Sequence, residues 1–152
     1  MADSRSPLTR SDIAARLTDL LGADAVDTRE AELREASVDR FKKYSAVHGI
    51  FDGPFPAAIA YPRSTDDVAA VLRFADENRI AVVPRTGRTA TEGGLETVIA
   101  DTIVLDGSRM DATLSINTVD MMVTVQCGVP LQRVEDELRA LGYTTGHSPQ
   151  SK

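Results

Sequence analysis

Aromatic residues and cysteine are scarce in this sequence: among 152 residues there are no Trp, three Tyr, four Phe and one Cys. A buried core must therefore consist mainly of Val, Leu, Ile and Ala. The single cysteine, Cys127, excludes an intrachain disulfide and is typical of a protein from a reducing compartment. Because Cys127 lies within the apolar run 123–129, we expect its thiol to be buried and unreactive.

Basic residues are fewer than acidic ones, with 17 Lys and Arg against 23 Asp and Glu, so the net charge is −6. Nucleic acids are bound by basic surfaces, so we expect no nucleic acid partner. No stretch approaches the roughly 20 apolar residues of a membrane-spanning helix, and the first residues contain no apolar signal core. We therefore expect a cytoplasmic protein without a membrane span. These features leave its oligomeric state open.

Patterns that would indicate catalysis or metal binding are missing as well. No paired carboxylates, metal-ligand cluster or Ser/His/Asp set stands in a recognisable context, so the chain offers no candidate catalytic residue and no candidate metal ligand. A length of 152 residues fits one domain or part of one. The composition, 42% hydrophobic and 26% charged, is typical of a globular protein with a sizeable core.

The first fifty residues read as a helical extension. Ser11 or Asp12 is expected to begin a helix that Gly22 ends. The charged segment 23–44 is expected to be a solvated, partly helical surface.

A strand–helix–strand pattern follows. An apolar strand is expected over 57–61 and another over 80–83, where Pro84 should end it because proline has no N–H to donate. Between them, Ser64 and Asp67 have the spacing of a capping box. The buried face of this helix is predicted to hold Val68, Val71, Leu72 and Ala75. Such a βαβ unit has parallel strands.

The remaining elements are expected to be a strand, a hairpin and a helix. A third strand is expected over 102–105, followed by a hairpin around 117–120 with one buried face, in which Met121 and Met122 fill the core. Pro130 is expected to open a helix that Gly142 terminates. The buried face of this helix is predicted to hold Val134, Leu138 and Leu141.

Residues 84–94 are the most informative stretch, with three Gly, three Thr and two Arg among eleven residues. Glycines let a loop turn tightly and bring backbone amides close to a ligand, and such amides beside guanidinium groups suit a phosphate or pyrophosphate. The spacing fits neither a Walker A loop, which needs a lysine, nor the Rossmann fingerprint. A glycine-rich turn without a ligand is the other interpretation. As a ligand loop, it would leave the carboxyl end of a parallel strand, where α/β folds commonly bind ligands.

The order of these elements resembles the flavin-binding domain of the vanillyl-alcohol oxidase, or PCMH-type, family. It is most similar to the branch with D-lactate dehydrogenase, a glycolate oxidase subunit and alkylglycerone-phosphate synthase. The resemblance covers roughly residues 45–152 and is carried by the stretches 57–68, 82–94, 103–111, 123–129 and 142–151.

The resemblance implies an α+β fold: a small parallel βαβ subdomain followed by the start of a second, mainly antiparallel subdomain. Residues 1–50 would be an N-terminal helical extension, and residues 51–152 an FAD-binding PCMH-type domain that is incomplete at its C-terminal end. FAD would be the ligand. The residues implied to contact it are Pro84, Arg85, Thr86, Gly87, Arg88, Thr89 and Ala90 around the pyrophosphate, Gly93 and Gly94 at the loop exit, and Ser148, Pro149, Gln150 and Ser151 at a second contact.

Two departures from the family pattern bear on these implications. Thr86 and Arg88 occupy places where this branch often has glycine, and Arg88 is expected to supply charge instead. Some relatives attach flavin covalently through a His in this loop, whereas residues 84–94 contain no His or Cys, so non-covalent binding is expected.

The resemblance also implies an activity for the whole protein. Family enzymes continue into the rest of the flavin domain and a substrate-binding cap, so a small-molecule substrate would bind only in a longer chain. The expected function is the FAD-binding segment of an oxidoreductase acting on a small 2-hydroxy acid or related substrate. The alternative is a non-catalytic binding or interaction module that kept the fold.

Overall fold

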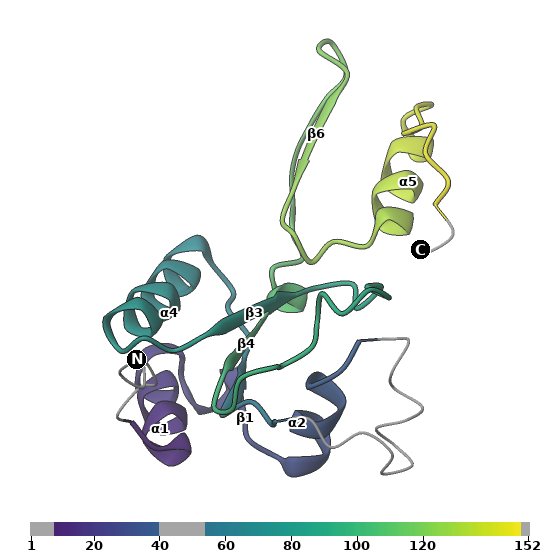
Figure 1. Cartoon of the computed structure of the whole chain (residues 1–152). Helices are drawn as coiled ribbons and strands as arrows, with labels where there is room; N and C mark the ends of the chain where they lie inside the picture. The colour runs from purple at the N-terminus through teal and green to yellow at the C-terminus, as the bar shows by residue number, and fades with distance from the viewer. Residues whose placement is uncertain (1–7, 40–53, 150–152) are drawn as a thin grey trace.

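The structure of the protein is a computed structural model that describes residues 8–39 and 54–149. Figure 1 shows a sheet flanked by helices, from which a hairpin and a final helix project. The elements are α1 (Arg10–Leu21), β1 (Val26–Asp27), α2 (Glu30–Ala36), β2 (Ala58–Ala60), α4 (Thr65–Glu77), β3 (Val82–Arg85), β4 (Ile103–Asp106), β5 (Thr113–Asn117), β6 (Met122–Val125) and α5 (Leu131–Ala140), with short 3₁₀ turns η1 (Ala23–Ala25) and η2 (Gly107–Arg109).

Helices α1 and α4 begin with capping boxes. In α4 the expected pair is confirmed: the Asp67 amide donates to Ser64 Oγ and the Ser64 amide donates to Asp67 Oδ2, both at 3.1 Å. In α1 the N-cap is Thr9, not Ser11 or Asp12, because Asp12 lies three residues further on and completes the box from inside the helix. Gly22 ends α1 as predicted, with a φ of 89°.

The main sheet has four strands in the order β1-β2-β4-β3. Strands β2, β4 and β3 are parallel, and β1 pairs with β2 in the antiparallel direction. The predicted strand–helix–strand unit is present, but β4 lies between its two strands. The sequence analysis missed β1, whose two residues carry no periodic pattern of their own.

Strand β3 continues through Pro84 to Arg85, so the prediction that Pro84 ends it is wrong. The amide of Ile103 donates to the carbonyl oxygen of Ala81, which places residues 81, 83 and 85 toward β4. By alternation, the nitrogen of Pro84 faces away from β4. Since β3 is an edge strand, the missing N–H costs no ladder hydrogen bond.

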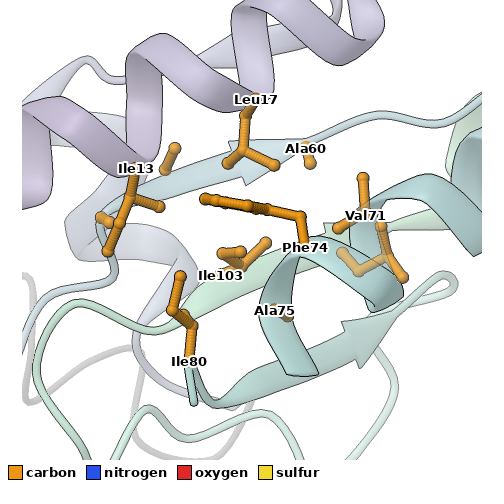
Figure 2. Packing of buried hydrophobic residues seen from close by; sticks show 11 residues of the cluster. Ile13, Leu17, Ala60, Val71, Phe74, Ala75, Ile80 and Ile103 are labelled. Carbon is orange, nitrogen blue, oxygen red and sulfur yellow. The ribbon is translucent and has the colours of Figure 1, made fainter. Parts of the chain in front are cut away.

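Helices α1 and α4 cover one face of the sheet, and α2 packs on the other. Figure 2 shows Phe74 lying between Ile13 and Leu17 of α1 and the strand residues Ala60 and Ile103. The expectation that Leu72 is buried is wrong: Leu72 is 46% exposed and Phe74 only 7%. The buried stripe of α4 runs through Val71, Phe74 and Ala75, so the helix is rotated relative to the predicted face.

The β5–β6 hairpin extends away from the main sheet, with α5 beside it (Figure 1). Its predicted buried face is only half buried, through Ile116, Val123 and Val125. A bulge between Thr113 and Ser115 shifts the register and leaves Leu114 60% exposed. Several side chains expected to be buried here or in α5 are exposed instead, namely Met121, Met122, Cys127 and Leu141.

The α+β fold class is confirmed, with a mainly parallel sheet followed by an antiparallel hairpin. In α5, Val134 and Leu138 are buried as predicted, and Gly142 follows the helix with a φ of 81°. The predicted domain boundary at residue 50 lies outside the described residues.

Candidate functional site

The glycine-rich loop leaves the carboxyl end of β3, directly beside the carboxyl end of β4. The last residues of the two strands, Arg85 and Asp106, are paired in register. Two backbone chains therefore turn away from the sheet at one edge, where parallel sheets commonly bind ligands. Beside the loop lies a hollow of about 320 Å³, whose lining includes Pro84, Thr86 and Cys127.

Asp106 organises the charges at this edge. Its side chain is fully buried and accepts hydrogen bonds from Arg85 Nε at 2.8 Å, Arg88 Nη2 at 3.1 Å and the amide of Ser108 at 3.0 Å. Burial acts to raise the pKa of Asp106, but the hydrogen bonds from Ser108 and the charges of Arg85 and Arg88 together hold that pKa below its ordinary value. Asp106 is therefore an ionised anchor for both arginines of the loop.

The two arginines have different surroundings. The side chain of Arg85 is 5% exposed and pairs with Asp106, so its guanidinium is buried within the protein. The side chain of Arg88 is 44% exposed and also lies 3.9 Å from Glu35 Oε1, on α2. Of the two guanidinium groups, that of Arg88 is the one accessible to an anion from solvent.

The middle of the loop presents unused backbone donors. Within the described parts of the chain, the amides of residues 86–90 donate to no protein acceptor. Arg88 has a φ of 54°, in the left-handed region that glycine favours and that the family's glycine would adopt easily. A left-handed residue in such a loop turns successive N–H groups toward one concavity, an arrangement that binds anions.

The exit of the loop is tied to the N-terminal part of the chain. Gly93, with a φ of 86°, donates its amide to Asp39 Oδ2 at 2.5 Å. The amide of Thr97 donates to the carbonyl oxygen of Ser37 at 3.0 Å. The Gly93 amide is therefore already hydrogen-bonded within the protein. The sequence analysis missed Ser37 and Asp39, because a charged segment resembles ordinary surface.

The second predicted contact follows α5. Ser148 is exposed and Pro149 half buried, while Gln150 and Ser151 lie outside the described residues. The chain leading to them is held by Glu135, which accepts hydrogen bonds from Thr144 Oγ1 at 2.6 Å and the Thr145 amide at 3.0 Å. In the described residues, no hydrogen bond or ion pair joins 148–149 to the loop.

The described parts of the chain hold neither a metal-binding cluster nor a membrane-spanning helix. Residues 8–39 and 54–149 contain no group of three His, Cys, Asp or Glu side chains placed to hold a metal ion. Their helices are all too short or too polar to cross a membrane.

Comparison with known proteins identifies the family. A family model described as FAD binding domain matches residues 56–152. The uncharacterized FAD-linked oxidoreductase YgcU of Escherichia coli (strain K12) is 50% identical over 145 residues, which are 95% of this chain and 30% of that protein. D-2-hydroxyglutarate dehydrogenase of Xanthomonas citri pv. viticola is 42% identical over 89 residues, which are 59% of this chain and 19% of that protein.

A solved structure shows the same fold. An alkyldihydroxyacetonephosphate synthase superposes with a TM-score of 0.84 at 20% identity, over 99% of this chain and 28% of that one. The chain spans about 30% of the length of YgcU. Its fold is the PCMH-type fold that the sequence resemblance implied. The chain belongs to the FAD binding domain family.

Proposed function

We propose that this chain is the FAD-binding part of a flavin-dependent oxidoreductase and that residues 84–94 hold the pyrophosphate of FAD without a covalent bond. The observation that carries this proposal is the row of unused amides at residues 86–90 beside the accessible guanidinium of Arg88. Backbone N–H groups and an arginine are the donors that suit a diphosphate. The lack of His and Cys in this loop supports non-covalent binding.

Each predicted residue has a distinct part in this proposal. Thr86, Gly87, Arg88, Thr89 and Ala90 would donate amides, and Arg88 would add charge. Pro84 and Arg85 would set the start of the loop, Arg85 through Asp106. Gly93 and Gly94 would shape its exit, and Ser148, Pro149, Gln150 and Ser151 would begin the second flavin contact.

For the whole protein, we propose oxidation of a small 2-hydroxy acid or a related substrate. Support comes from the Xanthomonas relative, which is a D-2-hydroxyglutarate dehydrogenase. Bound FAD would supply the redox chemistry by accepting a hydride equivalent from the substrate. The residues of this chain would bind and orient the cofactor. Residues 51–152 would form the cofactor domain, preceded by the extension of residues 1–50. The single cysteine supports a cytoplasmic location.

The variant Gly87→Val tests the loop assignment. A Cβ at Gly87 would meet only Thr89 Cγ2, at 3.8 Å, and Gly87 does not have a positive φ, so the protein should fold normally. A branched side chain there would still keep a diphosphate away from the backbone. We expect FAD titration, followed by flavin fluorescence, to show at least about a hundredfold weaker binding, equivalent to ~2.7 kcal/mol.

The matched control is Ala100→Val, which adds similar bulk at an exposed loop position outside residues 84–94. It should bind FAD like the parent. If Gly87→Val binds FAD as tightly as the control, the loop is not the pyrophosphate site. A parent that is monomeric, folded and colourless but binds another protein would favour the non-catalytic binding module.

A further inference from the structure

The last turn of α2 and the residues that follow it contact the loop and the chain just beyond its exit at three points. Glu35 Oε1 lies 3.9 Å from Arg88 Nη1, the carbonyl of Ser37 accepts from the Thr97 amide at 3.0 Å, and Asp39 Oδ2 accepts from the Gly93 amide at 2.5 Å. These contacts join stretches that are far apart in the sequence, with 54 residues separating Asp39 from Gly93. A part of the chain that resembles an ordinary charged surface therefore lies against the proposed cofactor loop.

Asp39 makes the most demanding of these contacts. Asp39 is only 2% exposed, so its carboxylate needs hydrogen-bond donors in place of the water that it loses on burial. The Gly93 amide is such a donor, and a hydrogen bond from an amide to a carboxylate is stronger than one between neutral groups. Gly93 also closes a turn in which the Glu96 amide donates to its carbonyl oxygen at 3.1 Å. The position of Gly93 is therefore held from both its amide and its carbonyl.

The loop is consequently fixed at both ends. At its start, Arg85 is bound to buried Asp106, and at its exit Gly93 is bound to buried Asp39. The unused amides of residues 86–90 lie between these two anchors. A loop that is ordered before the ligand arrives loses less conformational entropy on binding, which increases affinity.

We propose that Asp39 is a positioning residue for the FAD loop, acting from the N-terminal extension through the amide of Gly93. This inference rests on the proposed function, because it assumes that residues 86–90 receive the FAD pyrophosphate. Asp39 does not contact the cofactor; it holds the backbone that does.

The test compares Asp39→Ala with Asp39→Asn. Alanine removes the acceptor for the Gly93 amide, whereas the Asn carbonyl oxygen retains an acceptor without the charge. Asp19→Ala is the matched control, since it removes an exposed carboxylate whose partner Arg16 is 3.8 Å away. Two measurements apply to the protein: the dissociation constant for FAD, and amide hydrogen exchange of residues 86–94 compared with β2 and β4.

We expect Asp39→Ala to weaken FAD binding by about tenfold or more and to speed exchange across residues 86–94, with β2 and β4 as protected as in the parent. Asp39→Asn should recover most of the affinity and the loop protection. This rescue, together with a local change in exchange, separates positioning from a general loss of stability. If the alanine variant fails to fold, the affinity and loop exchange of Asp39→Asn provide the decisive measurement.

Other outcomes overturn the inference. If the parent binds FAD and Asp39→Ala binds it equally tightly, Asp39 does not position the loop, although the loop assignment stands. If Asp39→Asn loses as much affinity as Asp39→Ala, or if it binds FAD more tightly than the parent, charge and not the hydrogen bond is what matters. If the parent takes up no FAD, the proposed function fails and the inference fails with it.

Discussion

The backbone of Gly128 lies against the carbonyl oxygen of Gly107, so close that a Cβ on Gly128 would come within 2.3 Å of that oxygen. The same carbon would lie 2.9 Å from the carbonyl oxygen of Met110, to which the Gly128 amide donates. These contacts attach the chain leading into α5 to the end of β4. Because the opposing atoms are backbone, they cannot move aside as a flexible side chain would.

Gly128→Ala should therefore reduce the free energy of unfolding by about 2 kcal/mol or more, as overpacking of a closely packed site does. Urea unfolding followed by circular dichroism would measure this loss. The control is Gly94→Ala, whose Cβ would meet the Ala90 side chain at an ordinary 3.7 Å. That control should lie within about 0.5 kcal/mol of the parent. Equal stability of the two variants would contradict the close approach seen here.

The anchor of the loop arginines gives a second prediction. Asp106→Asn removes the negative charge between Arg85 and Arg88 and leaves the Arg85 guanidinium buried without its counter-ion. Loss of one partner of a buried pair costs about 3 kcal/mol or more in the free energy of unfolding. Urea unfolding would measure it, with Asp19→Asn at an exposed position as the control. A loss no larger than in the control would show that the pair contributes little.

Glu135 gives a prediction about pH. Hydrogen bonds from Thr144 and Thr145, assisted by Arg139, lower the pKa of Glu135 from 4.5 to about 2. Because the folded pKa is the lower one, the ionised form stabilises the fold. This contribution is complete above about pH 4.5 and is lost as the pH falls toward 2.

The amide signal of Thr145 in NMR spectra should therefore titrate with a midpoint near pH 2, since this amide donates to Glu135 Oε2. Glu135→Gln should abolish that titration. A midpoint near pH 4.5 in the parent would show that the carboxylate is not held by the 144–145 segment.

The rotation of α4 gives a prediction that opposes the sequence pattern. Phe74 packs between α1 and the sheet (Figure 2). It is 7% exposed, whereas Leu72 is 46% exposed. Phe74→Ala should lower the free energy of unfolding by about 3–5 kcal/mol. Leu72→Ala should cost less than about 1 kcal/mol. Thermal or urea unfolding of both variants checks this order, and a larger loss for Leu72→Ala would reverse the assigned helix face.

Local patterns predicted most of the regular elements, because apolar periodicity and capping act within a few residues. The capping box of Ser64 and Asp67 and the apolar strand ending at Asp106 are examples. Where the prediction was wrong, a distant partner decided the outcome. Leu72 and Phe74 point to different sides of α4, each at helical spacing from Val71 or Ala75, and only packing against α1 and the sheet selects Phe74. Pro84 is accommodated in a strand because, among the described strands, β3 is at the edge of the sheet and Pro84 faces its open side.

From its sequence alone this protein is an acidic chain with a strand–helix–strand unit and a glycine-rich loop after a parallel strand, because spacing, turn residues and charge are local properties of the chain. The tertiary structure decided which groups hold that loop. Asp106 lies 21 residues from Arg85, and Asp39 lies 54 residues from Gly93. Contacts over such separations arise only when the sheet aligns the ends of β3 and β4 and packs α2 against its face, so no local pattern could reveal them.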